Sequence, residues 1–208
     1  MTTGAETVAE GGGGATGGRV LRAQDRPATR WKNGGGLTRE VAADGSGAGL
    51  EDFVWRVSLA DVARGGPFSS FAGVDRIITV VDGAGMELNV DGASHTIADA
   101  YEPFSFPGDA VTDCRLLSGP IVDLNVMTRR TRATGHVRMA REGFSVVPRT
   151  GVLVLVIALA GTVAVEESGV TLDRFDAVLF PDRDAGTLRV DGVAAVVTVT
   201  TTSGSPGT

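Results

Sequence analysis

The sequence has few cysteine, histidine and aromatic residues, and it lacks a long apolar run. Its single cysteine, Cys114, excludes an intramolecular disulfide. The first residues show no basic segment followed by an apolar one, so we expect no secretory signal and a reducing, cytoplasmic location. The longest apolar stretch, Val152 to Ala160, is far shorter than the roughly 20 residues that cross a bilayer. We therefore expect no membrane partner.

Further absences restrict the chemistry. The two histidines, His95 and His136, have no second His or Cys within three to five residues, so neither a metal nor another cofactor is expected. Neither the G-x-S-x-G and S-x-x-K nucleophile motifs nor a phosphate-binding P-loop is present. The net charge of −6 disfavours nucleic acid as a partner, because phosphates require a basic surface.

The residues that are abundant favour β-structure. Thirty glycines and many valines are typical of strands joined by tight turns. Met86, Leu88 and Val90 alternate with polar residues, which predicts a strand with one buried face. Helical periodicity is confined to a turn or two at Leu59–Arg64 and at Arg138–Glu142. We expect strands covered on both faces at Ile77–Val81 and Val152–Leu159, and hairpins at Asp82-Gly83, Asp91-Gly92 and Asp191-Gly192.

The two halves of the chain resemble each other. The segment GAGMELNVDGASHTIADAYEPFSFPGDA can be aligned with LAGTVAVEESGVTLDRFDAVLFPDRDA at a spacing of roughly 75 residues, too long for a solenoid. This indicates a duplicated small β-barrel or sandwich. We expect one barrel over 19–132, a second over 133–201, a disordered glycine-rich start over 1–18 and a frayed tail over 202–208. Polar residues are concentrated in the first copy, so we expect any site there.

One candidate site element is WKNGGGLTRE, Trp31 to Glu40. Three adjacent glycines are costly to order, so a folded domain usually places them where the backbone turns sharply or closely approaches another group. Lys32, Asn33 and Thr38 add polar groups around that bend. The alternative is an ordinary exposed loop, because Gly and Asn are common loop residues.

Two predicted strands could supply the other walls of a site. In FVWRVSLA, Arg56 and Ser58 share the face opposite Trp55, and in VDLNVM, Asp123 and Asn125 share one face. These faces either line one barrel interior or point to water.

An arginine-containing segment adds a third candidate. Asp75-Arg76 could be a buried ion pair that orients a ligand or one that merely holds a loop. The fork of an arginine suits a carboxylate, so the basic groups favour a small anionic ligand. We expect Arg129 and Arg130 to be solvated.

The motifs WKNGGGLTRE, WRVSLADV, GPFSSFAGVDR, FPGDA and VDLNVMTRR together resemble the HutD/Ves family of small bacterial proteins. The resemblance implies an all-β bicupin, with two antiparallel barrels in one chain and very little helix. It also implies a metal-free cavity, since paired histidines are missing, and a role in sensing or flux control linked to histidine utilisation or stress response. The family's motifs map onto Trp31, Lys32, Asn33, Gly34, Gly35, Gly36, Thr38, Glu40, Arg56, Ser58, Asp75, Arg76 and Asn125.

Three functional hypotheses follow. The first is a bicupin that binds a small anionic metabolite such as urocanate or formylglutamate, with Arg56 or Arg76 on its carboxylate. The second is a metal-free isomerase or hydrolase that uses Glu40 or Asp123 as a general base, because a carboxylate in a dry barrel can have a raised pKa. The third is a structural or partner-binding module. A homodimer is compatible with all three.

Overall fold

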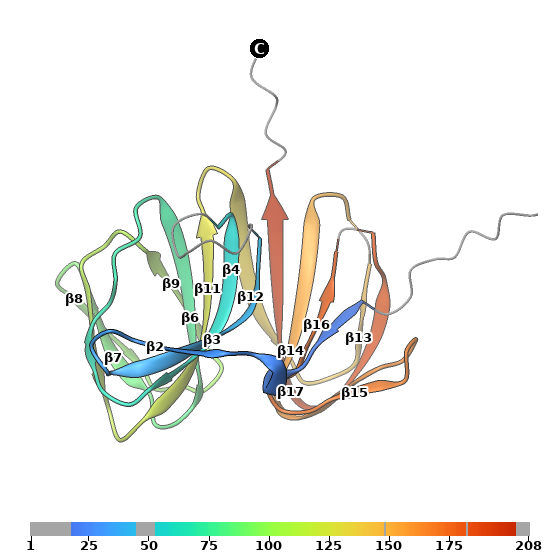
Figure 1. Cartoon of the computed structure of the whole chain (residues 1–208), viewed down its shortest axis with the longest axis horizontal. Helices are drawn as coiled ribbons and strands as arrows, with labels where there is room; N and C mark the ends of the chain where they lie inside the picture. The colour runs from blue at the N-terminus through green and yellow to red at the C-terminus, as the bar shows by residue number, and fades with distance from the viewer. Residues whose placement is uncertain (1–17, 45–52, 148, 182, 203–208) are drawn as a thin grey trace, which may run out of the picture.

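The computed structural model describes residues 18–44, 53–147, 149–181 and 183–202 (Figure 1). The expected disordered start and frayed tail therefore lie almost wholly outside the described residues. Strands dominate what is described, with one 3-10 helix, η1 (Ala23–Asp25). The strands are β1 (Arg19–Leu21), β2 (Ala28–Arg30), β3 (Gly36–Ala43), β4 (Trp55–Val62), β5 (Gly66–Pro67), β6 (Val74–Asp82), β7 (Met86–Val90), β8 (Ala93–Ile97), β9 (Pro103–Pro107), β10 (Thr112–Leu116), β11 (Ile121–Arg129), β12 (Ala133–Ala140), β13 (Phe144–Val146), β14 (Val152–Val165), β15 (Val170–Leu172), β16 (Ala177–Phe180) and β17 (Gly186–Thr201).

The all-β class is confirmed, and the two predicted helical turns are wrong. Residues 59–62 belong to β4, and residues 138–140 belong to β12. Both segments pair with antiparallel neighbours, β4 with β3 and β11, and β12 with β17. Their short helical pattern gave way to strand pairing, because a turn or two of helix has little stability of its own.

The strands form two units, each around its own apolar core. The first barrel consists of a six-stranded sheet, β2-β3-β4-β11-β6-β9, and a four-stranded sheet, β5-β10-β7-β8. The second barrel is a seven-stranded sheet with the path β1-β16-β14-β17-β12, to which β13 and β15 add at β17 and β14. The two barrels lie side by side in Figure 1. We interpret them as two cupin-like units.

The order of strand pairing is similar in the two barrels. In the first barrel, β6 pairs with β9, and β7 pairs with β8. In the second barrel, the single long strand β14 pairs with β16 through its first half and with β15 through its last residues. Strand β17 likewise corresponds to β10 and β11 together, because it pairs with β12, β13 and β14. Two successive strands that lie in different sheets of the first barrel, β6 with β7 and β10 with β11, therefore correspond to one continuous strand in the second barrel.

Of the three predicted Asp-Gly hairpins, one is confirmed. Asp91 and Gly92 join β7 to β8 with φ angles of 49° and 86°. Asp82-Gly83 is instead a corner that carries the chain from the six-stranded to the four-stranded sheet. Asp191-Gly192 lies within β17, where Gly192 is paired with Gly161. A Cβ on Gly192 would lie 2.1 Å from the Ala160 carbonyl oxygen, so close strand approach, not a hairpin, requires this glycine.

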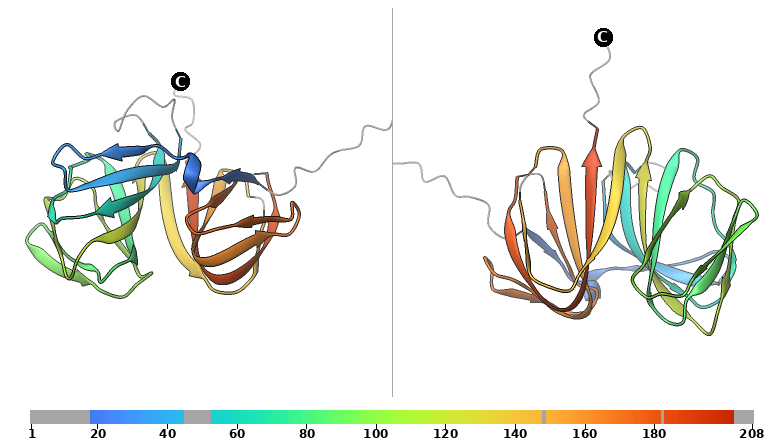
Figure 2. Two further views of the ribbon diagram at one scale, coloured as in Figure 1. Left: turned by 60° about the horizontal axis from the view of Figure 1, so that its bottom comes forward. Right: turned by 180° about the vertical axis from the view of Figure 1, so that it is seen from behind.

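A third apolar core joins the two barrels. Trp55, Leu59 and Leu124 of the six-stranded sheet pack with Leu155 and Ile157 of β14 in one buried cluster. Figure 2 shows the same central strands between the barrels from two further directions. The strands expected to be covered on both faces are largely buried for this reason: one face looks into a barrel and the other onto the neighbouring barrel.

The start of the described chain belongs to the second barrel. Strand β1 pairs with β16, although 19–132 was the expected range of the first barrel. Asp176 holds the residues that follow β1 against the second barrel, because it accepts hydrogen bonds from Arg22 Nη1 (2.6 Å) and from the Ala23 amide (2.7 Å). Burial raises the pKa of Asp176, but these donors outweigh burial and hold that pKa below its usual value.

Candidate functional site

Strand register brings the predicted polar residues of the first barrel together on one face. Residues directly opposite in an antiparallel pair share a face of the sheet. Around β11, Met127 lies between Arg56 and Arg76, Asn125 between Ser58 and Ile78, and Asp123 between Ala60 and Val80. Ala60, Ile78 and Val80 belong to the core that contains Met86, Leu88 and Cys114 of the four-stranded sheet, so this face looks into the barrel.

Arg76 is the buried cation of this interior. Its residue is only 6% exposed. Its guanidinium carbon lies 4.8 Å from the Phe68 ring centroid, 5.1 Å from that of Phe106 and 5.9 Å from that of Phe71. These distances are within cation–π range, so the rings offset part of the lost hydration. Burial lowers the pKa of Arg76 to about 10, even though Asp123 acts in the opposite direction, and Arg76 stays charged at neutral pH.

Asp123 and Asn125 face the same interior from β11. Asp123 is 2% exposed, and burial raises the pKa of its carboxyl to about 7, with Arg76 opposing this rise and Asp61 adding to it. Asp123 Oδ1, Asn125 Oδ1 and Arg76 Nε are buried and have no hydrogen-bond partner among the described residues. Buried polar atoms without a partner are rare in folded proteins, and functional sites are one of the places where they occur.

Arg56 and Glu40 form an ion pair at the edge of this polar region. Arg56 Nε lies 2.8 Å from Glu40 Oε2, and the two side chains are 15% and 52% exposed. Glu40 is therefore not a carboxylate in a dry barrel, and the exposure of its side chain removes the reason for expecting a general base there. Of the two candidate bases, Asp123 alone has the buried environment that the hypothesis requires.

The WKNGGG stretch packs on the first barrel, at the end away from the two arginines. Gly36 pairs with Val62, whereas Arg56 lies six residues earlier on β4, or about 20 Å along an extended strand. A Cβ on Gly36 would lie 2.4 Å from the Asp61 carbonyl oxygen, and Gly34 has a φ of 66°. The glycines are thus needed for a close approach and a turn, as predicted.

The polar groups of that stretch divide between the interior and the surface. Thr38 shares the inward face with Ala60, and its hydroxyl accepts a hydrogen bond of 2.8 Å from Trp31 Nε1. The Asn33 side chain accepts from the Gly35 amide and so shapes the loop. Lys32, Asn33 and Gly34 are exposed.

The predicted Asp75-Arg76 ion pair is not formed, because adjacent residues on a strand point to opposite faces. Asp75 is exposed and accepts a hydrogen bond from Arg130 Nε. Arg130 also contacts both carboxylate oxygens of Asp109, so it is bonded in a surface network instead of simply solvated. Arg129 donates to the Phe53 carbonyl oxygen and is half-buried.

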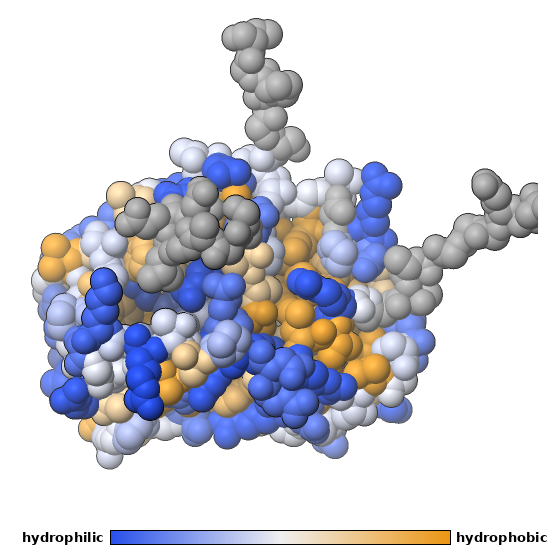
Figure 3. All heavy atoms as spheres, in the orientation of Figure 1, coloured by the Kyte–Doolittle hydropathy of each residue, from blue (hydrophilic) through white to orange (hydrophobic). Residues whose placement is uncertain are grey.

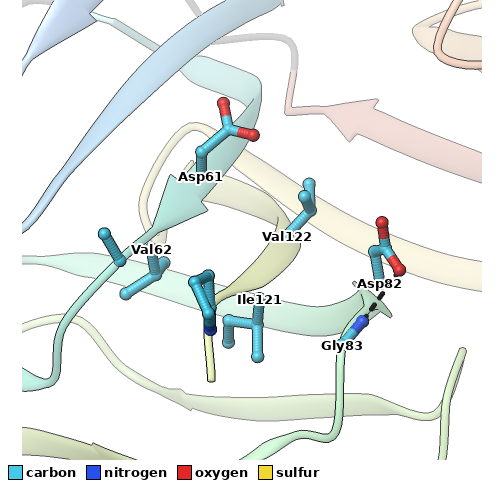
Figure 4. Close-up of a pocket in the computed structure, with 8 residues that line it drawn as sticks. Asp61, Val62, Asp82, Gly83, Ile121 and Val122 are labelled. Atoms are coloured by element: carbon cyan, nitrogen blue, oxygen red, sulfur yellow. Dashed lines mark hydrogen bonds between the residues drawn. The ribbon is translucent and has the colours of Figure 1, made fainter.

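The described residues also line a hollow of about 220 Å³, whose walls include Asp61, Asp82 and Gly83 (Figure 4). Asp61 and Asp82 extend their carboxylates along this hollow, but each is engaged by an arginine. Arg174 of the second barrel lies 2.9 Å from Asp82, so the hollow borders the contact between the barrels. Its charges are already paired, and we do not regard it as the binding site.

The described residues of the second barrel include no comparable set of polar groups at the corresponding positions. Ala194 and Val196 of β17 occupy the places of Asp123 and Asn125, and they belong to its apolar core. On the face shown in Figure 3, apolar residues gather over the second barrel, whereas hydrophilic residues cover much of the first. Within the described ranges, no group of three or more potential metal-ligating side chains is found, and no helix could span a membrane.

Sequence reasoning missed the three phenylalanines around Arg76. Phe68 and Phe71 lie in GPFSSFAGVDR, and Phe106 lies in FPGDA. Both motifs contribute to the family resemblance, but the sequence predicted no role for these rings. The available signal was the spacing of Phe68 and Phe71 just before Arg76. Phe106 could not have been placed by spacing, because it reaches Arg76 through the pairing of β9 with β6.

Comparison with solved structures places the fold among cupin-like β-barrels. A cupin 2 conserved barrel domain protein from Leptotrichia buccalis superposes with a TM-score of 0.57 over 89% of this chain and 97% of that chain, at 8% identity. HutD from Pseudomonas fluorescens SBW25 superposes with a TM-score of 0.78 at 36% identity, over 88% and 98% of the two chains. A conserved protein of unknown function from Pseudomonas aeruginosa PAO1 gives 0.76 at 35% identity, over 89% and 98%.

Sequence comparison then identifies the family. The HutD family model matches residues 23–198, and the chain therefore belongs to the HutD family. An uncharacterized 21.2 kDa protein in the hutC 3′ region of Pseudomonas putida is 40% identical over 156 residues, which cover 75% of this chain and 81% of that protein. Protein Ves of Citrobacter koseri is 40% identical over 134 residues, covering 64% and 69%.

Proposed function

We propose that the first barrel binds a small anionic metabolite, whose carboxylate is held by Arg76. Ser58 and Asn125 face the same interior, and their role in the proposal is to orient the ligand. Arg76 suits the role better than Arg56, because the Arg56 guanidinium already has the Glu40 carboxylate as a partner. Arginine can offer two parallel hydrogen bonds to a carboxylate, which fixes both position and orientation.

One observation supports this proposal above the others. Arg76 Nε, Asp123 Oδ1 and Asn125 Oδ1 are buried on one inward face without a partner among the described residues. Leaving such groups unpaired costs about 1–3 kcal/mol each, more for a charged group, so a ligand that pairs with them recovers substantial free energy. The apolar interior of the second barrel has no equivalent groups at these positions.

The biological role that we propose is sensing or flux control in histidine utilisation. The Pseudomonas putida relative is described by its position in the hutC 3′ region, which supports a link to that pathway. Urocanate and N-formylglutamate are carboxylates from histidine breakdown and are therefore the first ligands to test. Stress response, which the resemblance to the HutD/Ves family implies, is the second setting that we propose for the same binding activity.

Calorimetric titration with urocanate and N-formylglutamate tests the proposal. Arg76→Met should weaken binding by about 30-fold or more, because losing one partner of a buried charged pair costs at least about 2 kcal/mol. Arg115→Met is the matched control: Arg115 lies on β10 of the same barrel, but its side chain is 65% exposed and pairs with Glu87 on the surface. Urea unfolding of each variant establishes that the barrel is intact. Absence of binding by the wild-type protein to either compound would refute the proposal.

A second candidate function is metal-independent acid–base catalysis by Asp123. The buried carboxyl with a pKa raised to about 7 favours it, because a general base works best when its pKa lies near the working pH. An isomerase or hydrolase of this kind should turn over a candidate metabolite in the presence of a chelator, and Asp123→Asn should abolish that turnover. Binding without turnover across a panel of carboxylate metabolites would exclude it.

A further inference from the structure

We infer that the first barrel takes up a proton together with its anionic ligand, and that Asp123 is the residue that receives the proton. The inference rests on the proposed function and adds how the site selects and responds to its ligand. Arg76 and Asp123 are 6% and 2% exposed and face one interior. Arg76 already offsets part of the charge of Asp123, so a ligand carboxylate on Arg76 would add a second negative charge to this interior, and protonation of Asp123 removes the excess.

The charged groups around Asp123 leave Arg76 as its main counter-charge. On β4, Arg56 is paired with Glu40, and Asp61 lies on the opposite face in an ion pair with Arg39. On β10 across the barrel, burial raises the pKa of the Cys114 thiol to about 11, so it is neutral at pH 7. The remaining titratable groups on the strands around this interior are exposed or only half-buried: Arg30, Asp75, Asp82, Glu87, His95, Asp113, Arg115 and Arg129.

Hydrogen bonding supports the same conclusion independently of charge. Asp123 and Asn125 are two residues apart on β11, so their side chains share one face. Both of their partnerless atoms, Asp123 Oδ1 and Asn125 Oδ1, are oxygens that accept hydrogen bonds. A protonated Asp123 gains an O–H donor, which can be given to Asn125 Oδ1 or to the ligand carboxylate. The proton comes from solvent, and no covalent bond of the ligand changes.

The dependence on pH has a defined sign. Asp123 in the free protein titrates at about 7, and a nearby ligand anion raises the pKa further. Well below pH 7 the carboxyl is protonated before and after binding, so affinity does not change with pH. Between the pKa of the free site and that of the complex, affinity falls as pH rises, approaching tenfold per unit. The dissociation constant should therefore be about tenfold larger at pH 8 than at pH 6.

Calorimetry of the full chain in buffers with different ionisation enthalpies counts the protons. N-formylglutamate and acetate are the probes, because neither titrates between pH 6 and 8. The expected uptake is close to one proton per bound ligand at pH 8 and close to zero at pH 6. In Asp123→Asn, uptake at pH 8 should vanish, and the affinities at pH 6 and 8 should agree. Asp113→Asn, an exposed carboxylate of the same barrel, should leave the uptake unchanged.

The outcomes separate this inference from the proposed function. Binding without proton uptake at pH 8 overturns the inference and leaves carboxylate binding by Arg76 intact. Uptake that persists in Asp123→Asn shows that another group receives the proton and overturns the assignment. No binding of either probe at either pH, together with none of urocanate, removes the proposed function itself and the inference with it.

Discussion

The ionised form of Asp123 should destabilise the protein in the absence of ligand, and Asp123→Asn should reveal this as a pH-dependent gain in stability. Asp123 is almost completely buried, and its pKa rises from 3.8 to about 7 on folding. A carboxyl with a raised pKa holds its proton longer in the folded state than in the unfolded state. Its effect is absent below about pH 4, grows between pH 4 and 7, and is constant at higher pH.

The magnitude follows from the size of that pKa change. Each unit corresponds to about 1.4 kcal/mol, so ionised Asp123 costs at most about 4 kcal/mol above pH 7. Integration over the two pKa values gives a loss of roughly 2–3 kcal/mol between pH 5 and pH 8. Asparagine has nearly the same shape and no charge, so the variant should lose this part of the pH dependence. Any change in packing caused by the amide is the same at both pH values and cancels in the comparison.

Urea unfolding of the wild-type protein and the variant at pH 5 and pH 8, without ligand, measures the effect. The variant should gain roughly 2–3 kcal/mol relative to wild type on going from pH 5 to pH 8. Asp113→Asn serves as the control, because this exposed residue on β10 should show no such gain. Equal differences between variant and wild type at the two pH values would show that Asp123 is already ionised at pH 5. That result would contradict both its raised pKa and its role as proton acceptor.

Two further predictions test the contact between the barrels and the glycine stretch. Leu124→Ala should lower the free energy of unfolding by about 2–5 kcal/mol, because Leu124 is fully buried in the core shared by the barrels; Val111→Ala, at an 80% exposed position, should change it by less than about 0.5 kcal/mol. Gly36→Ala should cost about 1–3 kcal/mol, because its Cβ would meet the Asp61 carbonyl oxygen at 2.4 Å. Gly35→Ala should cost less, because its nearest neighbour is the Asn33 side chain at 3.1 Å. Equal urea midpoints for the members of either pair would contradict this packing.

The local sequence pattern predicted those features that depend on alternation along one strand. Arg56 and Ser58 share one face because side chains alternate with a period of two, and Asp123 and Asn125 share one face for the same reason. These properties depend on residues that are close together in the chain, so the local sequence was enough to predict them.

Pairing between distant segments decided the rest. Alternation could not say whether a polar strand face meets water or a barrel interior, and only the packing of β7 and β10 over Ala60 and Val80 settled it. Nor could it show that Glu40 would be exposed at the edge while Asp123 became buried. Both are carboxylates on strands, and the sequence by itself made them equal candidates. The raised pKa of Asp123 depends on how many other strands exclude water around it, which is a property of the folded barrel and not of the neighbouring residues in the chain.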